Sequence, residues 1–202
     1  MFQRPRPGSF REDQLETAEM YLARERRLLF LKGPIMGVPG RWDQFSTTAV
    51  HDAILAFNVE DSSRPIYLVI DSPGGEVTEG WTLYDAIRMS LAEVVTVGQA
   101  CGSMAAVLLA AGRRRLVYPH ATVMLHLPWG AMQGDVEVVA IRAAQLRKAR
   151  DRIVDAYLEC GVTSSREQVL KDMDREFWLD ATEAVAYGLA DAVVDPNELF
   201  GR

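Results

Sequence analysis

A serine between a strand-like and a helix-like segment is the first residue that could do chemistry. Ser103 follows the apolar run 94–97 and opens the apolar run 103–111. A hydroxyl at such a turn can cap the helix by accepting a hydrogen bond from a backbone N–H. It can also act as a nucleophile, because the turn exposes it and a helix N-terminus favours developing negative charge. Cys101 is the rival nucleophile, but its neighbours indicate the end of a strand.

Three histidines could serve as the base that activates a serine. His51 is expected within a helix at the surface, and His120 in a loop between two strands. His126 follows the apolar run 122–125, and active sites of open parallel sheets gather at the carboxyl ends of strands. His126 is therefore the best candidate for the general base. A carboxylate should orient it, and the pattern leaves four candidates open: Asp172, Asp174, Glu176 and Asp180.

A pair of glycines could stabilise a reaction intermediate. The sequence Ser72-Pro73-Gly74-Gly75 follows the buried-strand candidate 66–70. Paired glycines permit unusual φ angles and can expose an N–H group, although they also suit a simple tight turn. The N–H groups of Gly75 and Met104 could point at one tetrahedral intermediate if their strands are neighbours. Together these residues suggest a hydrolase.

The segments that must position these residues alternate between strand-like and helix-like patterns. Helices are expected at about 13–26, 44–58, 78–91, 103–111 and 134–160, and strands at 28–31, 66–70, 94–97, 116–118, 122–126 and 190–194. Two capping boxes, Ser164 with Glu167 and Asp180 with Glu183, predict two further short helices. This alternation predicts an α/β fold with a mostly parallel sheet.

The long helix at about 134–160 carries more apolar positions than the residues after it could cover. We expect it to project from the domain and pack on another copy of the chain. The alternative is an ordinary surface helix that lies on the sheet.

The composition is that of a globular protein with one domain. The chain has 202 residues, 49% of them hydrophobic and 25% charged, and a net charge of −6. Bulk charge therefore gives no indication of nucleic-acid binding. The two cysteines and three histidines lack the spacing of metal ligands, so no metal is expected. No apolar run reaches the roughly 18 residues of a membrane span, and residues 1–10 lack a signal-peptide core, so we expect a cytoplasmic protein.

A series of short motifs runs through the chain in a fixed order. They are Phe30-Leu31 with Gly33-Pro34-Ile35, Ile70 to Gly75, Gly98-Gln99-Ala100, Ser103-Met104, Leu108 to Gly112, Pro119, Val123 to His126 with Pro128, and Glu183-Ala184 with Tyr187-Gly188-Leu189 and Asp191. In this order and at nearly these spacings they resemble the proteolytic subunit of the Clp protease, ClpP. The resemblance runs from about residue 20 to 195. A single motif is moderately specific, and the whole series is highly specific.

The resemblance implies a ClpP/crotonase-like α/β fold. Such a fold has stacked, mostly parallel sheets with surrounding helices and a protruding handle helix, here at about 134–160. The expected organisation is one peptidase domain over 20–195, an N-terminal tail over 1–19 and a C-terminal tail over 196–202.

The resemblance also implies an ATP-dependent serine endopeptidase that hydrolyses unfolded polypeptides to short peptides. Family members form two stacked heptameric rings that are fed by a hexameric AAA+ unfoldase. Only the unfoldase uses ATP, so this chain is expected to need no cofactor and no metal. Neither a membrane nor a nucleic-acid partner is expected.

Positions in the family motifs imply a role for each site residue. Ser103 matches the nucleophile, His126 the base and Glu176 the carboxylate of the triad. Gly75 and Met104 match the oxyanion donors. Backbone at Gly74, Val77 and Trp129 is expected to bind the substrate as an added strand, which gives weak sequence preference.

Three positions depart from the family pattern. The family usually has Gly-x-Ala-x-Ser-Met, and here one extra residue puts Gly102 where a strict count from Gly98 would put the serine. Glu176 stands where the family has aspartate, and Asp71 where it usually has asparagine.

These departures keep alternatives open. One is a non-catalytic ClpP-like paralogue that fills positions in a mixed ring. Another is a serine–lysine peptidase related to signal peptide peptidase A, which would need Lys32, Lys148 or Lys171 at the site and usually a membrane anchor. A third is a crotonase-type acyl-CoA enzyme that shares the fold alone and would lack the pair of Ser103 and His126.

Overall fold

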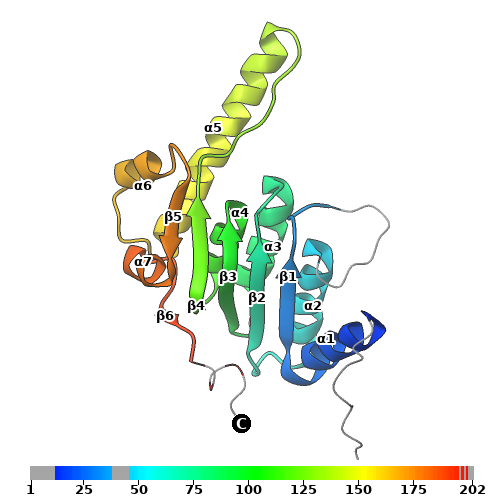
Figure 1. Cartoon of the computed structure of the whole chain (residues 1–202). Coiled ribbons are helices and arrows are strands. Elements are labelled where there is room, and N and C mark those ends of the chain that lie inside the picture. The colour runs from blue at the N-terminus through cyan, green and yellow to red at the C-terminus, as the bar shows by residue number, and fades with distance from the viewer. Residues whose placement is uncertain (1–11, 38–45, 196, 198, 200–202) are drawn as a thin grey trace, which may run out of the picture.

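The structure is a computed structural model that describes residues 12–37, 46–195, 197 and 199 (Figure 1). The helices are α1 (Glu12–Arg26), α2 (Thr47–Glu60), α3 (Val77–Met89), α4 (Met104–Ala111), α5 (Val136–Glu159), α6 (Arg166–Asp172) and α7 (Ala181–Tyr187). The strands are β1 (Leu28–Lys32), β2 (Ile66–Ser72), β3 (Val94–Gly102), β4 (Arg114–Leu125), β5 (Phe177–Asp180) and β6 (Ala192–Val193).

The strands of the described residues form one sheet with the order β1-β2-β3-β4-β5, and β6 pairs with β4. All neighbours are parallel except β4 and β5, which are antiparallel. The α/β class and the mostly parallel sheet are therefore confirmed. Where stacked sheets were expected, the described residues contain a single one. Strands β1 to β4 all end at the same edge, from which α5 projects (Figure 1).

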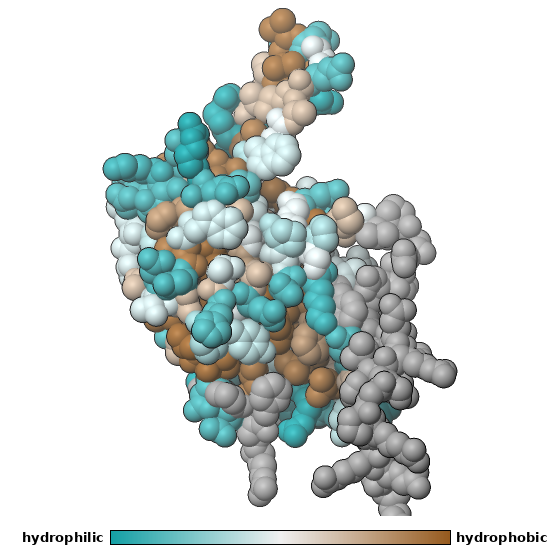
Figure 2. Space-filling model, in the orientation of Figure 1, coloured by the Kyte–Doolittle hydropathy of each residue, from teal (hydrophilic) through white to brown (hydrophobic). Residues whose placement is uncertain are grey.

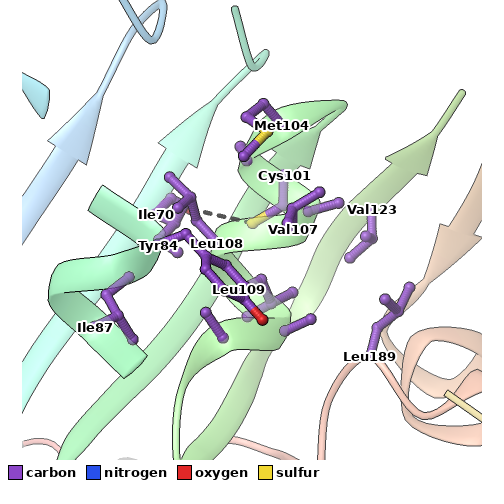
Figure 3. Close-up of a cluster of buried hydrophobic side chains, with 14 of the residues drawn as sticks. Ile70, Tyr84, Ile87, Cys101, Met104, Val107, Leu108, Leu109, Val123 and Leu189 are labelled. Atoms are coloured by element: carbon purple, nitrogen blue, oxygen red, sulfur yellow. Dashed lines mark hydrogen bonds between the residues drawn. The ribbon is translucent and has the colours of Figure 1, made fainter. Parts of the chain in front are cut away.

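Helices α2, α3 and α4 lie behind the sheet in the view of Figure 1. Every residue of α4 is buried, which explains why its sequence is almost wholly apolar. Figure 3 shows Ile70 of β2, Ile87 of α3 and Leu108 of α4 in this core. Apolar burial of this kind fixes α4, and with it the turn at its N-terminus, against the strands.

The long helix α5 protrudes from the body of the molecule, as the sequence predicted (Figure 1). Its buried residues, Ile153, Val154, Ala156 and Tyr157, all lie near its C-terminal end. Val136 and Ile141 near its other end are 82% and 61% exposed. Figure 2 shows apolar surface at the tip of this projection.

Several element boundaries differ from the predictions. The predicted strands 116–118 and 122–126 merge into one continuous strand, β4, which ends at Leu125, so His120 lies in a strand and not in a loop. Pro119 is tolerated because it lies in an irregular stretch, between the pairs of Val117 with Gly98 and of Thr122 with Ala100. Strand β5 was not predicted, because its four residues give too short a pattern.

Of the two predicted capping boxes, one is confirmed and the other is wrong by one residue. Asp180 and Glu183 form the predicted box at the start of α7. The N-cap of α6 is Ser165, whose hydroxyl accepts from the N–H of Gln168, so the prediction of Ser164 was off by one residue. Helix α1 begins at Glu12, inside the segment 1–19 that was expected to be a tail. The rest of the predicted tails lies mostly outside the described residues.

No helix in the described ranges is long and apolar enough to cross a membrane. In the same ranges, no three His, Cys, Asp or Glu side chains form a group that could hold a metal ion.

Candidate active site

Three neighbouring strands bring the predicted site residues to one edge of the sheet. The turn at Pro73-Gly74-Gly75 follows β2, Ser103 follows β3 and His126 follows β4. The Oγ atom of Ser103 lies 2.7 Å from Nε2 of His126. The structure therefore brings together the two side chains that the sequence proposed as nucleophile and base, although they are 23 positions apart.

The backbone of Ser103 has an unusual conformation, with φ 55° and ψ −122°. Such a conformation costs a non-glycine residue about 1 to 3 kcal/mol. The N–H of Ser103 donates to the carbonyl of Met124 at 2.7 Å, which ties the turn to β4. Ser103 occupies the N-cap position of α4, but its hydroxyl makes no capping hydrogen bond, so the predicted capping role of the side chain is wrong. The sharp turn presents the hydroxyl to His126 instead.

The extra residue before Ser103 is accommodated within β3. On β2, Ile70 pairs with Gly98 and the next residue, Asp71, pairs with Ala100. Gln99 is therefore left out of the pairing, which is the pattern of a β-bulge. Because the bulge takes up one residue, β3 still ends at Gly102 and the turn begins at Ser103.

Glycines permit the turns after β2 and β3 to lie against each other. Gly74 has a φ of +91°, and a Cβ atom there would lie 2.5 Å from the carbonyl oxygen of Gly102 and 2.9 Å from the backbone nitrogen of Met104. Gly102 is equally restricted, since a Cβ atom there would lie 2.8 Å from the carbonyl oxygen of Pro73. No larger residue fits at either position without moving backbone, so the contact places the glycine pair beside the start of α4.

Two backbone N–H groups at this contact have no protein acceptor in the described part of the chain. They belong to Gly75 and Met104, the predicted oxyanion donors. The loop of Gly75 is held from the other side by Ile35, which donates to the carbonyl of Gly74 at 2.9 Å and accepts from Glu76 at 2.8 Å. Fixed donors without a partner are what an oxyanion site requires.

These groups line a pocket of about 490 Å³. Ser103, His126, Gly75 and Met104 all contribute to its wall, as do the three predicted substrate-binding residues Gly74, Val77 and Trp129. The Trp129 side chain is 80% exposed and stands at the surface.

The apolar inner wall of the pocket was not predicted. It includes Val107, Met124, Ile153 and Tyr157. Val107 could have been found, because it lies one helical turn after Ser103 on the same face of α4. Ile153 and Tyr157 come from α5, and no pattern in the sequence connects that helix to the turn at Ser103.

None of the four carboxylate candidates forms a hydrogen bond to His126 in the described residues. Glu176 accepts from Nε1 of Trp178 at 3.1 Å. The others also have different partners, namely Tyr187 for Asp172 at 2.9 Å, Arg175 for Asp174 at 3.4 Å, and the backbone of Glu183 for Asp180 at 2.8 Å. The structure thus presents a serine–histidine pair, and it does not bring Glu176 to the imidazole.

The rival residues lie elsewhere. Cys101 is 1% exposed with its thiol 3.6 Å from the carbonyl of Ile70 (Figure 3), and burial raises its pKa to about 12, so it is no nucleophile. His51 lies in α2 and pairs with Asp52 at 3.0 Å, and His120 is exposed in β4. Within the described residues, the wall of the pocket contains no lysine, so a serine–lysine pair has no support there.

A comparison with protein families agrees with this arrangement. The model of the Clp protease family matches residues 19–197, which is most of the chain. The match spans the turn after β2, Ser103, His126 and the whole of α5. The chain belongs to the Clp protease family.

Proposed function

We propose that the chain is a serine endopeptidase of the ClpP type that cleaves peptide bonds through an acyl-enzyme on Ser103. The contact of 2.7 Å between Oγ of Ser103 and Nε2 of His126 carries this proposal. It lies within the distance that proton transfer requires, and the two atoms meet in a pocket lined by unpaired backbone donors.

In the first half of the reaction, Nε2 of His126 takes the proton of Ser103 while Oγ attacks the carbonyl carbon of the substrate. The carbonyl oxygen becomes an oxyanion, which accepts hydrogen bonds from the N–H groups of Gly75 and Met104. The intermediate collapses when the C–N bond breaks and the imidazolium gives its proton to the leaving amine. In the second half, His126 takes a proton from water, the hydroxide attacks the acyl group, and Ser103 regains its proton.

The substrate backbone would lie beside Gly74 and Val77 on one side and Trp129 on the other, as an added strand. These residues line the same pocket as the nucleophile. Hydrogen bonds to the substrate main chain do not depend on its side chains, so we expect broad sequence specificity.

We propose Glu176 as the group that orients His126 in the active assembly. Its carboxylate must first leave Trp178, which holds it at 3.1 Å. Glu176→Gln should lower kcat by about 10²-fold or more, because the imidazole loses its orienting partner. Asp172→Asn and Asp174→Asn are the matched controls, and they should leave kcat within a few-fold of the native value. If either control loses more activity than Glu176→Gln, that aspartate takes the role.

We further propose an assembly of two stacked heptamers that receives unfolded polypeptides from a hexameric AAA+ unfoldase, which alone consumes ATP. The exposed apolar residues Val136 and Ile141 on α5 support association, because isolated chains rarely leave such positions uncovered on a projecting helix. Mass photometry at micromolar concentration should give particles of ring size. A monomer alone would contradict this assembly.

The peptidase activity is tested directly with a fluorophosphonate probe and a short fluorogenic peptide. The native protein should be labelled on Ser103 and should cleave the peptide. Ser103→Ala should do neither, whereas Ser90→Ala, which changes a buried serine in the loop after α3, is the control and should do both. A correctly assembled particle that neither reacts nor cleaves would overturn the proposal in favour of a non-catalytic subunit.

A further inference from the structure

A second hollow of about 680 Å³ lies next to the active-site pocket. We call it the handle groove, and its wall includes Val77, Trp81, Met132, Arg142, Lys148 and Arg152. Val77 lines both the groove and the active-site pocket. The segment after β4 is also shared, since Trp129 lines the pocket and Gly130 the groove. A strand docked beside Ser103 could therefore continue into the handle groove.

The charge of the handle groove differs from that of the whole chain. The chain has a net charge of −6, yet the groove is lined by three cationic residues and no acidic one among the described residues. Among the acids that adjoin groove residues in the sequence, Glu76, before Val77, lines the active-site pocket and not the groove, and Asp151, before Arg152, pairs with Arg150. The groove is thus a local positive region beside the proposed nucleophile.

The three cations have no carboxylate partner in the described part of the chain. Arg142 donates to the carbonyl of Gln133 at 2.9 Å, and Arg152 stacks on the ring of Trp81 at 4.4 Å. Stacking fixes the plane of a guanidinium while its N–H edge stays available to a carboxylate. No ion pair of Lys148 is found in these residues either.

Two of the four acids of α5 pair with arginines that do not line the handle groove. Asp151 pairs with Arg150 at 2.8 Å, and Asp155 pairs with Arg166. The other two, Glu137 and Glu159, do not line the groove, so the side of α5 that faces the handle groove keeps its positive charge.

We propose that the handle groove is a subsite for an acidic stretch of the substrate polypeptide, a few residues away from the bond that is cleaved. This rests on the proposed peptidase function, which places the substrate strand at Gly74 and Val77. Carboxylates of Asp or Glu would pair with Arg142, Lys148 and Arg152, and apolar parts of the substrate would contact Met132. The subsite adds a charge preference to a site whose backbone contacts carry little sequence preference.

Binding is measured with the full-length assembled Ser103→Ala protein, so that the readout does not depend on catalysis. Three fluorescein-labelled peptides share one neutral core, and carry three glutamates before the core, three glutamates after it, or glutamines at both places. One of the two acidic peptides should bind about 5- to 10-fold more tightly than the glutamine peptide, which is what two or three partly exposed ion pairs give. The preference for the acidic peptide should shrink as the salt concentration is raised from 50 to 500 mM, because salt screens ion pairs that are exposed to solvent.

Matched variants locate the effect. Arg142→Gln with Lys148→Gln should remove the preference for the acidic peptide and leave the glutamine peptide unchanged. Arg150→Gln removes a cation of the same helix that is already paired with Asp151, and it should keep the preference. Equal affinity for all three peptides would overturn the proposal.

Two further outcomes are informative. If the double variant loses its native particle mass while peptide affinities are unchanged, the groove binds a second copy of the chain and the subsite proposal is wrong. The parent protein with Ser103 intact is assayed with the same peptides. Failure to cleave any of them, together with an intact preference for the acidic peptide, would refute the peptidase function and support the subsite.

Discussion

Two residues of the described chain share a rare backbone geometry and use it in opposite ways. Arg27 and Ser103 are the non-glycine residues there with positive φ, at 53° and 55°. Arg27 is 1% exposed, and its guanidinium donates to the carbonyls of Phe57, Asp61 and Arg64 around the end of α2. The side chain of Ser103 makes one hydrogen bond, to His126, and lines a pocket.

The difference shows what a strained backbone can and cannot indicate. At Arg27 the strain is offset by hydrogen bonds that satisfy the last carbonyls near α2, a purely structural role. The side chain of Ser103 makes no hydrogen bond to the backbone of α4. We therefore interpret the strained backbone there as a means of positioning a reactive hydroxyl. Positive φ alone does not identify a functional residue, and the partners of the side chain decide.

The largest expected effect separates the two residues by activity. Ser103→Ala should lower kcat by at least about 10³-fold, because no other group in the pocket can form the acyl-enzyme. Its free energy of unfolding should change by less than about 1 kcal/mol, since only one hydroxyl contact is lost. Peptide hydrolysis and urea unfolding of the same preparation give both numbers. Substantial residual hydrolysis would place the nucleophile elsewhere.

For Arg27 we expect the reverse of Ser103, a large loss of stability with little change in activity. Arg27→Met should lower the free energy of unfolding by about 2 to 4 kcal/mol, because three carbonyls lose their donor in a buried place. Activity per folded molecule should stay near the native value. Arg26→Met, at the exposed neighbouring position, is the control and should change stability by about 0.5 kcal/mol at most. If the two variants are equally stable, the hydrogen bonds of Arg27 do not stabilise the fold, and its structural role is refuted.

A third prediction uses a second guanidinium of the structural kind, which has a titratable partner. Arg115 donates to the carbonyls of Cys160 and Gly188 and pairs with Asp191. Burial opposes ionisation of Asp191, but the hydrogen bonds from Arg115 outweigh it and hold the pKa of this carboxyl below its ordinary value of 3.8. A lowered carboxyl pKa stabilises the folded state above the unfolded pKa, and this stability is lost as pH falls through the folded pKa.

Asp191→Asn should therefore destabilise the protein by about 1 kcal/mol at pH 7, a modest amount because the carboxylate is partly exposed. The difference from the native protein should start to shrink below about pH 4, because the unfolded carboxyl takes up a proton there, and it should vanish only once the pH falls below the lower folded pKa of Asp191. Urea unfolding at pH 7, 5 and 3.5 measures this. A difference that stays constant over this range would mean that the pair of Arg115 and Asp191 contributes nothing as an ion pair.

Parts of this site could be predicted because they depend on local pattern. Ser103 and His126 each follow a strong apolar run, and parallel strands must bring their ends to one edge. The capping box of Asp180 and Glu183 is a contact between residues three apart, so it is visible in the sequence.

The rest depends on contacts between segments far apart in the chain. Tyr157 reaches the pocket because α5 packs at its base against the core, and periodicity does not encode which elements meet. The hydrogen bond from Trp178 to Glu176 could not be predicted either, because Trp178 lies in β5, a strand too short to be recognised from the sequence. The bulge at Gln99, which settles the register before Ser103, appears only once β2 and β3 are paired.

The smallest expected effect tests whether the two residues share the same backbone strain. Glycine normally costs about 0.5 to 1 kcal/mol of stability relative to alanine, because it loses more conformational freedom on folding. At positive φ the order should reverse, since alanine retains the unfavourable Cβ contact.

We therefore expect Ser103→Gly to be about 1 kcal/mol more stable than Ser103→Ala, and Arg27→Gly to exceed Arg27→Ala by a similar amount. Each pair removes the same side-chain contacts, so the difference reports the backbone alone. Urea unfolding of the four variants measures both differences. If alanine matches or exceeds glycine at Ser103 but not at Arg27, the turn before α4 relaxes once its hydroxyl is gone. The contact between Ser103 and His126 would then hold the strained geometry in place, and the backbone would not impose it.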